Sequence, residues 1–87
     1  NNSSGPDIND LLSKLEKEPA NMDLVIELSE KYFSMKEYEN GMDLLLKNYS
    51  KNKDKVKNKM VEFFGLLGNT DQITIKYRKK LSQIMFS

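Results

Sequence analysis

Apolar residues recur every three or four positions along most of this chain, which is the spacing of one face of an α-helix. Five such segments follow one another, at about residues 7–17, 21–35, 38–49, 54–67 and 71–85. The alternation of apolar and polar residues that is typical of a half-buried strand does not stand out in the sequence. The pattern therefore predicts an all-α fold of about five helices.

Residues that favour helix ends separate these segments. Proline pushes the residue before it out of the helical region, so the first helix is expected to end there. Asn, Asp and Thr side chains accept hydrogen bonds from the first free N–H groups of a helix, and glycine or asparagine favours its left-handed end. The expected boundaries are Pro19, Asn21 as a cap, the tight connection Lys36-Glu37, Asp54 as a cap, Gly68-Asn69 as a stop, and Thr70 or Asp71 as a cap.

The apolar faces define an expected core. Gly41 inside a helix costs about 1 kcal/mol relative to alanine, so its presence predicts close backbone contact with the preceding helix, near Ser29. Ile26 and Phe33 lie on a flank of the second helix. The side chains expected to face inward are Ile8, Leu11, Leu12, Leu15, Leu24, Val25, Leu28, Tyr32, Met35, Tyr38, Met42, Leu45, Tyr49, Val56, Met60, Phe63, Phe64, Leu67, Ile73, Tyr77, Leu81, Ile84 and Met85.

The order of large and small residues indicates a helical-hairpin repeat. From Asn21 onward, the pair Leu28-Ser29 and the later Gly41 fit the 34-residue tetratricopeptide unit. Phe64-Gly65 echoes Leu28-Ser29 at an offset of 36 residues, and Pro19 stands where a preceding unit would end. The first helix is therefore interpreted as the second helix of a truncated repeat. The expected architecture is a right-handed superhelical stack of tetratricopeptide-like antiparallel helical hairpins.

The last third of the chain carries a more specific pattern, and residues 35–54 add a tyrosine, a small residue and a Leu-Leu pair. Together they resemble the C-terminal domain of thioredoxin-like proteins of the YbbN/CnoX (chaperedoxin) type, over about residues 7–87. The sequence departs from that family at Gly41, where an alanine is usual, and in its many lysines. The matching residues are Phe64, Leu67-Gly68, Asp71, Tyr77-Arg78-Lys79-Lys80-Leu81 and Ile84-Met85-Phe86.

The resemblance implies that residues 7–87 are the C-terminal, tetratricopeptide-like domain of a longer protein with a thioredoxin domain before it. Residues 1–6 are interpreted as a linker or cloning remnant. Members of the family are linked to protein folding under stress, where they hold unfolded clients and pass them to chaperones. The implied function is protein–protein interaction in a thioredoxin-like co-chaperone, with unfolded clients, a chaperone or a chaperonin as partners.

Two alternatives remain open. The domain could position substrates for a redox-active thioredoxin module, which a Cys-x-x-Cys in the preceding sequence would favour. It could also be a basic adaptor for nucleic acid, whose binding would collapse between low and moderate salt. The sequence leaves the identity of the partner and homo-oligomer formation undecided.

Composition narrows the chemistry. The 87 residues contain no cysteine and no histidine, so thiolate nucleophiles, imidazole bases and the usual zinc sites are absent. The carboxylate pairs have no Gly-rich cradle or metal set beside them. We therefore expect no catalytic residue, no metal and no cofactor, and a domain that is not an enzyme by itself. The sequence shows no membrane-length apolar run and no signal peptide, which favours the cytoplasm or an organellar matrix and no membrane partner.

The net charge of +1 conceals an uneven distribution. Residues 1–43 carry a charge of −6 and residues 44–87 a charge of +7. This asymmetry is typical either of two halves that attract each other in the folded state or of lysines on solvated helix faces. The lysines between positions 47 and 59 alternate along the chain instead of recurring at helical spacing, so they do not predict a basic strip for a phosphate backbone.

A partner-binding surface is predicted on the second helix. In a tetratricopeptide stack the first helix of each hairpin lines the concave side, and Ile26 and Phe33 would point there between Asp23 and Glu30. A shallow apolar groove rimmed by charge is a common form of peptide-binding site. The alternative interpretation is that a neighbouring helix covers these residues.

The fifth helix supplies a second set of candidates. Lys76, Lys79 and Lys80 share its outer face, where they could steer an acidic protein surface or serve as a solubilising face. Arg78 is the single arginine, and its planar fork suits a carboxylate. Its expected partner is an acidic residue of the same domain, for example one of the second or third helix, and the alternatives are a carboxylate of a partner protein or a solvated side chain. Tyr77 is expected to be buried, with its hydroxyl at the edge of the core.

Overall fold

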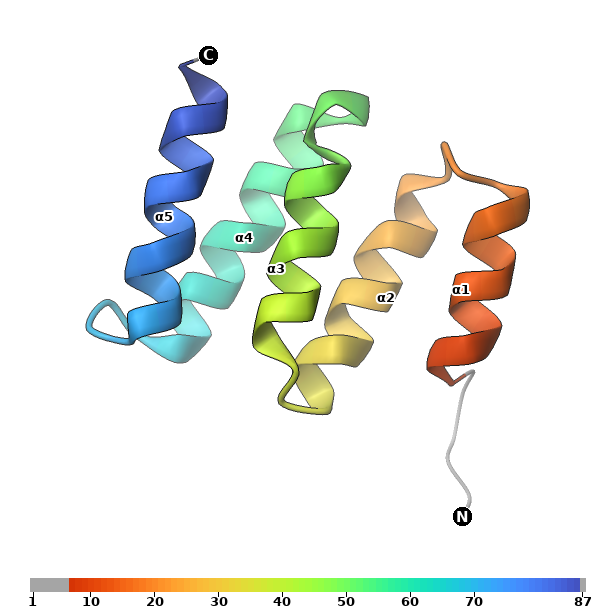
Figure 1. Cartoon of the computed structure of the whole chain (residues 1–87), viewed down its shortest axis with the longest axis horizontal. Helices are drawn as coiled ribbons and strands as arrows, with labels where there is room; N and C mark the ends of the chain where they lie inside the picture. The colour runs from red at the N-terminus through yellow and green to blue at the C-terminus, as the bar shows by residue number, and fades with distance from the viewer. Residues whose placement is uncertain (1–6, 87) are drawn as a thin grey trace.

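Helices make up most of the computed structural model, which describes residues 7–86 (Figure 1). Residues 1–6, predicted to be a linker, lie outside the described part. The predicted all-α fold is confirmed. The helices are α1 (Ile8–Lys17), α2 (Met22–Ser34), α3 (Tyr38–Lys47), α4 (Lys53–Leu67) and α5 (Gln72–Met85), with a short 3-10 helix, η1 (Tyr49–Lys51), between α3 and α4.

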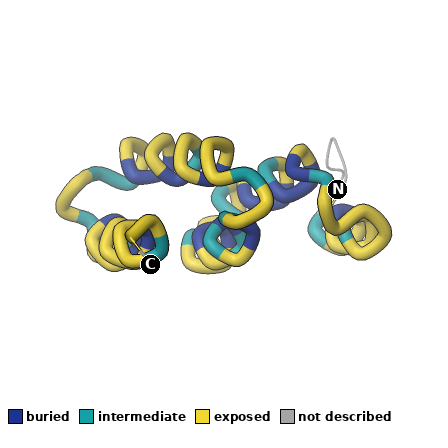
Figure 2. The backbone as a smooth tube through the Cα atoms, turned by 90° about the horizontal axis from the view of Figure 1, so that it is seen from above, coloured by how far each residue is buried: buried dark blue, intermediate teal, exposed yellow. Residues whose placement is uncertain are grey.

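The helices form two layers of a hairpin stack. Helices α1, α3 and α5 lie in one layer and α2 and α4 in the other, with buried residues facing the space between them (Figure 2). α2 packs against α1 and α3, and α4 packs against α3 and α5. Because α1 shares a layer with α3 and α5, it occupies the place of the second helix of a preceding hairpin, as the repeat pattern predicts.

Side-chain caps begin four of the helices. Asp7, Asn21 and Asp71 accept hydrogen bonds from the first N–H groups of α1, α2 and α5. The prediction that Asp54 caps α4 is wrong. Asn52 is the cap, and its Oδ1 accepts from the Lys55 N–H at 3.1 Å. Asp54 instead lies inside the first turn, where its negative charge interacts favourably with the helix dipole.

Two connections depend on positive φ angles. Gly68 ends α4 with φ of 97°, as predicted, and its N–H donates to the Phe64 carbonyl at 2.8 Å. At the α2–α3 connection Lys36 adopts φ of 64°, and the Glu37 N–H reaches back to the Tyr32 carbonyl at 2.9 Å. These bonds satisfy the last carbonyls of α2 and turn the chain tightly enough to place α3 beside α2.

The predicted core is largely confirmed, with differences at helix ends. Helix α3 ends at Lys47 instead of Tyr49, because the buried Asn48 donates its Nδ2 to the Leu44 carbonyl at 2.8 Å and ends the helix there. Met35 and Met85 were expected inside and are 45% and 40% exposed, since they lie at the last turns of α2 and α5, beyond the packed centre. Leu12 is also exposed, while Leu11 carries the contact of α1 with α2.

The backbones of α2 and α3 come into close contact where the two helices cross. Ser29 is fully buried and donates its Oγ to the Ile26 carbonyl at 2.7 Å. A Cβ added to Gly41 would lie 3.1 Å from the Ser29 carbonyl oxygen and 3.2 Å from Cδ1 of Phe33. Glycine at this position therefore lets the α3 backbone rest directly on α2. The predicted close contact is confirmed.

A buried tyrosine ties α5 to α3. Tyr77 is 1% exposed, and its hydroxyl donates to Oδ1 of Asp43 at 2.8 Å. Burial of the ring, together with the hydrogen bond and the negative charge of Asp43, raises the pKa of the Tyr77 hydroxyl well above its ordinary value. The predicted role of Tyr77, a core ring with its hydroxyl bonded at the edge, is confirmed.

Substitutions of two helix-interior glycines should differ in their effect on stability. An alanine at Gly65 meets no atom within 4 Å, so G65A should raise the free energy of unfolding by about 1 kcal/mol through helix propensity. At Gly41 the clash with the Ser29 carbonyl should cancel that gain for G41A, and G41L should lose about 2 kcal/mol or more. Urea unfolding followed by circular dichroism measures all three variants. Equal stabilisation by G41A and G65A would contradict the close crossing.

Removal of the Tyr77 hydroxyl should lower the free energy of unfolding by about 1 kcal/mol at neutral pH. The raised pKa favours the neutral phenol in the folded state, so this contribution is complete below the unfolded pKa of about 10 and is lost as the pH rises above it. The stability difference between the wild type and Y77F should therefore shrink at alkaline pH. Tyr49→Phe serves as the control, and a difference that is constant with pH would contradict the role of the hydroxyl.

Candidate functional site

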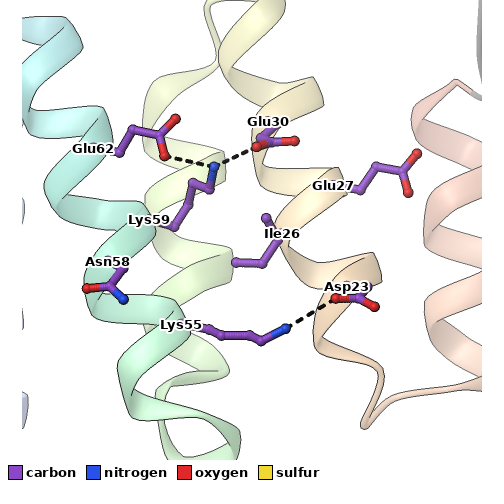
Figure 3. A pocket seen from close by; sticks show the side chains of 8 residues that line it. All are labelled: Asp23, Ile26, Glu27, Glu30, Lys55, Asn58, Lys59 and Glu62. Carbon is purple, nitrogen blue, oxygen red and sulfur yellow. Dashed lines mark hydrogen bonds and ion pairs between the residues drawn. The ribbon is translucent and has the colours of Figure 1, made fainter.

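A shallow, open groove of about 620 Å³ runs between α2 and α4, the two helices of one layer (Figure 3). Half-buried Ile26 is its apolar centre, and the remaining side chains that line it are polar or charged. The lining residues are Asp23, Ile26, Glu27 and Glu30 from α2, and Lys55, Asn58, Lys59 and Glu62 from α4.

The two sides of the groove occupy equivalent positions of successive hairpins. Asp23 and Lys55 are 32 residues apart, and each other lining residue of α2 has a counterpart on α4 at the same spacing. The sequence pattern aligned Phe64-Gly65 with Leu28-Ser29 at 36 residues, which is longer by about one helical turn. The buried faces do not follow the 36-residue alignment either, because Ser29 is fully buried whereas Gly65 is exposed and a Cβ added to it would meet no atom within 4 Å. The predicted pairing of Phe64-Gly65 with Leu28-Ser29 is therefore wrong, and buried Leu28 corresponds instead to buried Met60 at 32 residues.

Ion pairs cross the groove on either side of Ile26 (Figure 3). Nζ of Lys55 lies 3.3 Å from Oδ1 of Asp23, and Nζ of Lys59 lies 2.6 Å from Oε2 of Glu30. Lys59 also contacts Oε1 of Glu62, on its own helix, at 3.1 Å. The two lysines thus join α4 to α2 along the groove.

Lys59 is the most constrained of these groups. Its side chain is 13% exposed, and its ammonium lies 5.6 Å from the centre of the Phe63 ring. Burial alone would lower the pKa of Lys59, but the hydrogen bonds and charges of Glu30 and Glu62 raise it above its ordinary value. Lys59 therefore remains charged across the physiological pH range and holds two carboxylates at the groove.

The groove carries more negative than positive charge. Four carboxylates face two ammonium groups, which leaves a surplus of two negative charges at neutral pH. Glu27 is exposed, has no ion pair or hydrogen bond among the described contacts of its side chain, and extends toward α1 (Figure 3). The groove is thus an acidic surface with one apolar contact point.

Three of the predicted partner-binding residues meet in this groove: Asp23, Ile26 and Glu30. Phe33 does not line it. Its ring stacks on Phe63 at 3.6 Å between centroids and meets Tyr38 edge-on at 4.9 Å. Helix α4 therefore covers Phe33, which corresponds to the alternative interpretation made from the sequence.

The predicted set on α5 lies on other surfaces. Lys76 pairs with Glu39 at 3.1 Å, while Lys79 and Lys80 are exposed. The expected ion pair of Arg78 with an acidic residue of α2 or α3 is wrong. Its Nη2 donates to Oδ1 of Asn69 at 2.9 Å and its guanidinium lies 5.6 Å from the Phe64 ring, because Arg78 faces the α4–α5 turn, away from α2 and α3.

The uneven charge of the two halves is partly neutralised inside the fold. Each cross-helix ion pair joins a carboxylate of residues 1–43 to a lysine of residues 44–87: Asp23–Lys55, Glu30–Lys59 and Glu39–Lys76. The alternating lysines are spread as predicted, since Lys55 and Lys59 enter the groove while Lys47 and Lys51 line a separate depression between α1 and α3. The interpretation that the halves attract each other is supported by these contacts.

The sequence predictions did not include Glu27 or the groove residues of α4, which are Lys55, Asn58, Lys59 and Glu62. These residues are polar and follow no motif, so composition and periodicity give them no special weight. The spacing of the repeat could have identified them, because the positions 32 residues after Asp23 and Glu30 are Lys55 and Glu62. The 36-residue alignment concealed that relation.

Stacked antiparallel hairpins with a groove along one layer define a helical repeat scaffold. A family model described as tetratricopeptide repeat matches residues 1–86, so the chain belongs to that family. Its domains generally mediate protein–protein interaction and are typically non-catalytic. A search of curated proteins and a search of solved structures gave no significant match.

Residues 7–86 offer neither a membrane-spanning helix nor a cluster of metal ligands. No helix in this range is long and apolar enough to cross a membrane. No group of three or more His, Cys, Asp or Glu side chains in the same range is placed to hold a metal ion.

Replacement of Lys59 by methionine should destabilise the domain by about 1 kcal/mol, because two carboxylates lose their shared cation while the apolar stem is retained. Lys57→Met on the same helix is the matched control, since Lys57 is exposed and has no ion pair among the described contacts. Urea unfolding at low and high salt measures both. The cost of K59M should decrease at high salt, and equal costs for the two variants would contradict the bridging role.

Proposed function

We propose that this domain acts by binding another protein through the groove between α2 and α4, as the client- or chaperone-binding part of a thioredoxin-like co-chaperone. One observation carries the proposal. The layer that contains the first helix of each hairpin presents an open groove, and its apolar centre, Ile26, is one of the residues predicted for partner contact. Membership of a family whose domains generally bind proteins supports the same conclusion.

The groove has a neighbouring apolar contact. Leu66 is 71% exposed and lies one helical turn after Glu62, on the same face of α4. A bound segment could therefore rest on Ile26 and extend toward Leu66. Exposed apolar residues beside charged ones are typical of sites that hold extended or helical peptides.

The co-chaperone context rests on the resemblance of residues 7–87 to the helical domain of chaperedoxins. Unfolded clients expose apolar side chains, and a chaperone or chaperonin would offer a folded surface. We propose that Asp23, Ile26 and Glu30 contact the partner in either case. The exposed Lys79 and Lys80 of α5 are proposed as a separate steering surface, which would affect the association rate more than the final affinity.

The test is a binding assay with the complete 87-residue chain immobilised at two salt concentrations. A chemically unfolded model protein and a purified chaperonin are the probes. Leu66→Ser and Ile26→Ser should each weaken capture about fivefold to tenfold, corresponding to roughly 1 kcal/mol of lost contact. Val61→Ser is the matched control, because Val61 is also an exposed apolar residue of α4 but precedes Glu62 directly and so lies off the face shared by Glu62 and Leu66.

Circular dichroism checks that each variant is folded. Leu66→Ser is the decisive variant, since Leu66 is exposed and its loss should leave stability unchanged within about 0.5 kcal/mol. If neither probe binds, or if Val61→Ser weakens binding as much as Leu66→Ser, the groove is not the binding surface. Capture of the unfolded protein alone would favour client holding, and capture of the chaperonin alone would favour docking.

A further inference from the structure

We infer that the groove between α2 and α4 takes a positively charged segment of its partner, in which Lys or Arg side chains stand beside an apolar one. The inference rests on the proposed function of the groove and specifies the chemistry of the occupant. It follows from the charge balance, from the engagement of the two lysines and from the place of the apolar residues.

The two lysines of the groove are already engaged. Lys59 is bonded to Glu30 and Glu62, and Lys55 is paired with Asp23. An acidic segment would have to break these pairs and would also meet a surplus of negative charge. A basic segment meets the opposite situation, because it adds cations where carboxylates are in excess.

The carboxylates retain capacity to accept hydrogen bonds. Asp23, Glu30 and Glu62 each bond a lysine through one oxygen, at 3.3, 2.6 and 3.1 Å. An ionised carboxylate has two oxygens, and each accepts more than one hydrogen bond. A guanidinium or ammonium group can therefore bind without displacing Lys55 or Lys59.

Glu27 is the carboxylate of the groove that has no ion pair among the described residues. It lies one turn after Asp23, is exposed, and extends toward α1 and away from the two lysines (Figure 3). Its side chain has no hydrogen bond or ion pair among the described contacts. A cation of the partner at Glu27 would compensate a charge that the domain itself leaves uncompensated.

The apolar residues place the remaining part of the occupant. Ile26 lies between the two ion pairs that cross the groove (Figure 3). Leu66 is exposed and lies one helical turn after Glu62, on the same face of α4. An apolar side chain of the partner can contact Ile26 while its neighbouring cations reach the carboxylates on either side. Phosphate-bearing ligands are disfavoured here by the same surplus of negative charge.

The experiment compares three fluorescent peptides of equal length that share the same leucines and differ only in their charged positions, which are Lys, Gln or Glu. Binding to the complete 87-residue chain is measured by anisotropy, and the contact is located by amide chemical shifts. The Lys peptide should bind most tightly and the Glu peptide most weakly. The Lys peptide should shift amides of α2 and α4, and added salt should weaken its binding.

A matched pair of variants tests the role of Glu27. Glu27→Gln should weaken binding of the Lys peptide roughly two- to fivefold, as expected for one partly exposed ion pair, and Glu27→Lys should weaken it further. Glu16→Gln is the control, because Glu16 is an exposed carboxylate on α1 outside this groove. Neither Gln variant should change the affinity of the Gln peptide.

The outcomes separate the two proposals. If the Gln or Glu peptide binds best and shifts amides of α2 and α4, the proposed function is supported and the inference of a basic occupant is overturned. If no peptide shifts the residues of this groove, both are overturned. If Glu27→Gln and Glu16→Gln have the same effect on the Lys peptide, the attraction is non-specific and the inference is also overturned.

Discussion

The structure depends on the direct contact of two backbones at the crossing of α2 and α3. Because Gly41 has no side chain, α3 lies against the Ser29 carbonyl, and the buried Ser29 satisfies its own hydroxyl within α2. This close packing fixes the angle of the first hairpin. The second hairpin, formed by α4 and α5, packs on the first through Phe33, Phe63 and Tyr77. A displacement of α3 at Gly41 would therefore also move α4.

The groove is a consequence of that arrangement. Once α2 and α4 occupy the same layer, their outward faces stand side by side, and charges that are far apart in the chain become neighbours. Lys55 and Lys59 stabilise the arrangement by pairing with Asp23 and Glu30. The same pairs leave the groove acidic, because the carboxylates outnumber the lysines. Contacts that hold the two hairpins together thus also define what the surface can bind.

Surface electrostatics in this domain serve two different purposes. The ion pairs between the acidic and basic halves link consecutive hairpins, as in Glu39–Lys76, which joins α3 to α5 in the other layer (Figure 2). Glu27, Lys79 and Lys80 have no such pairing among the described residues, and they lie on different surfaces. A net charge near zero therefore coexists with one acidic groove and one basic helix face.

The sequence alone determined the helices, the cap at Asn21, the glycine stop at Gly68 and the crossing at Gly41, and it limited the cap of α5 to Thr70 or Asp71. These features depend on local preferences and on periodicity, which a single chain displays directly. Only the tertiary structure decided that Phe33 lies under α4, that Arg78 turns to Asn69 and that Glu27 and Lys59 belong to one groove. Those outcomes depend on which helix faces meet. If the repeat register shifts by one helical turn, every residue across the groove has a different neighbour, although each helix stays the same.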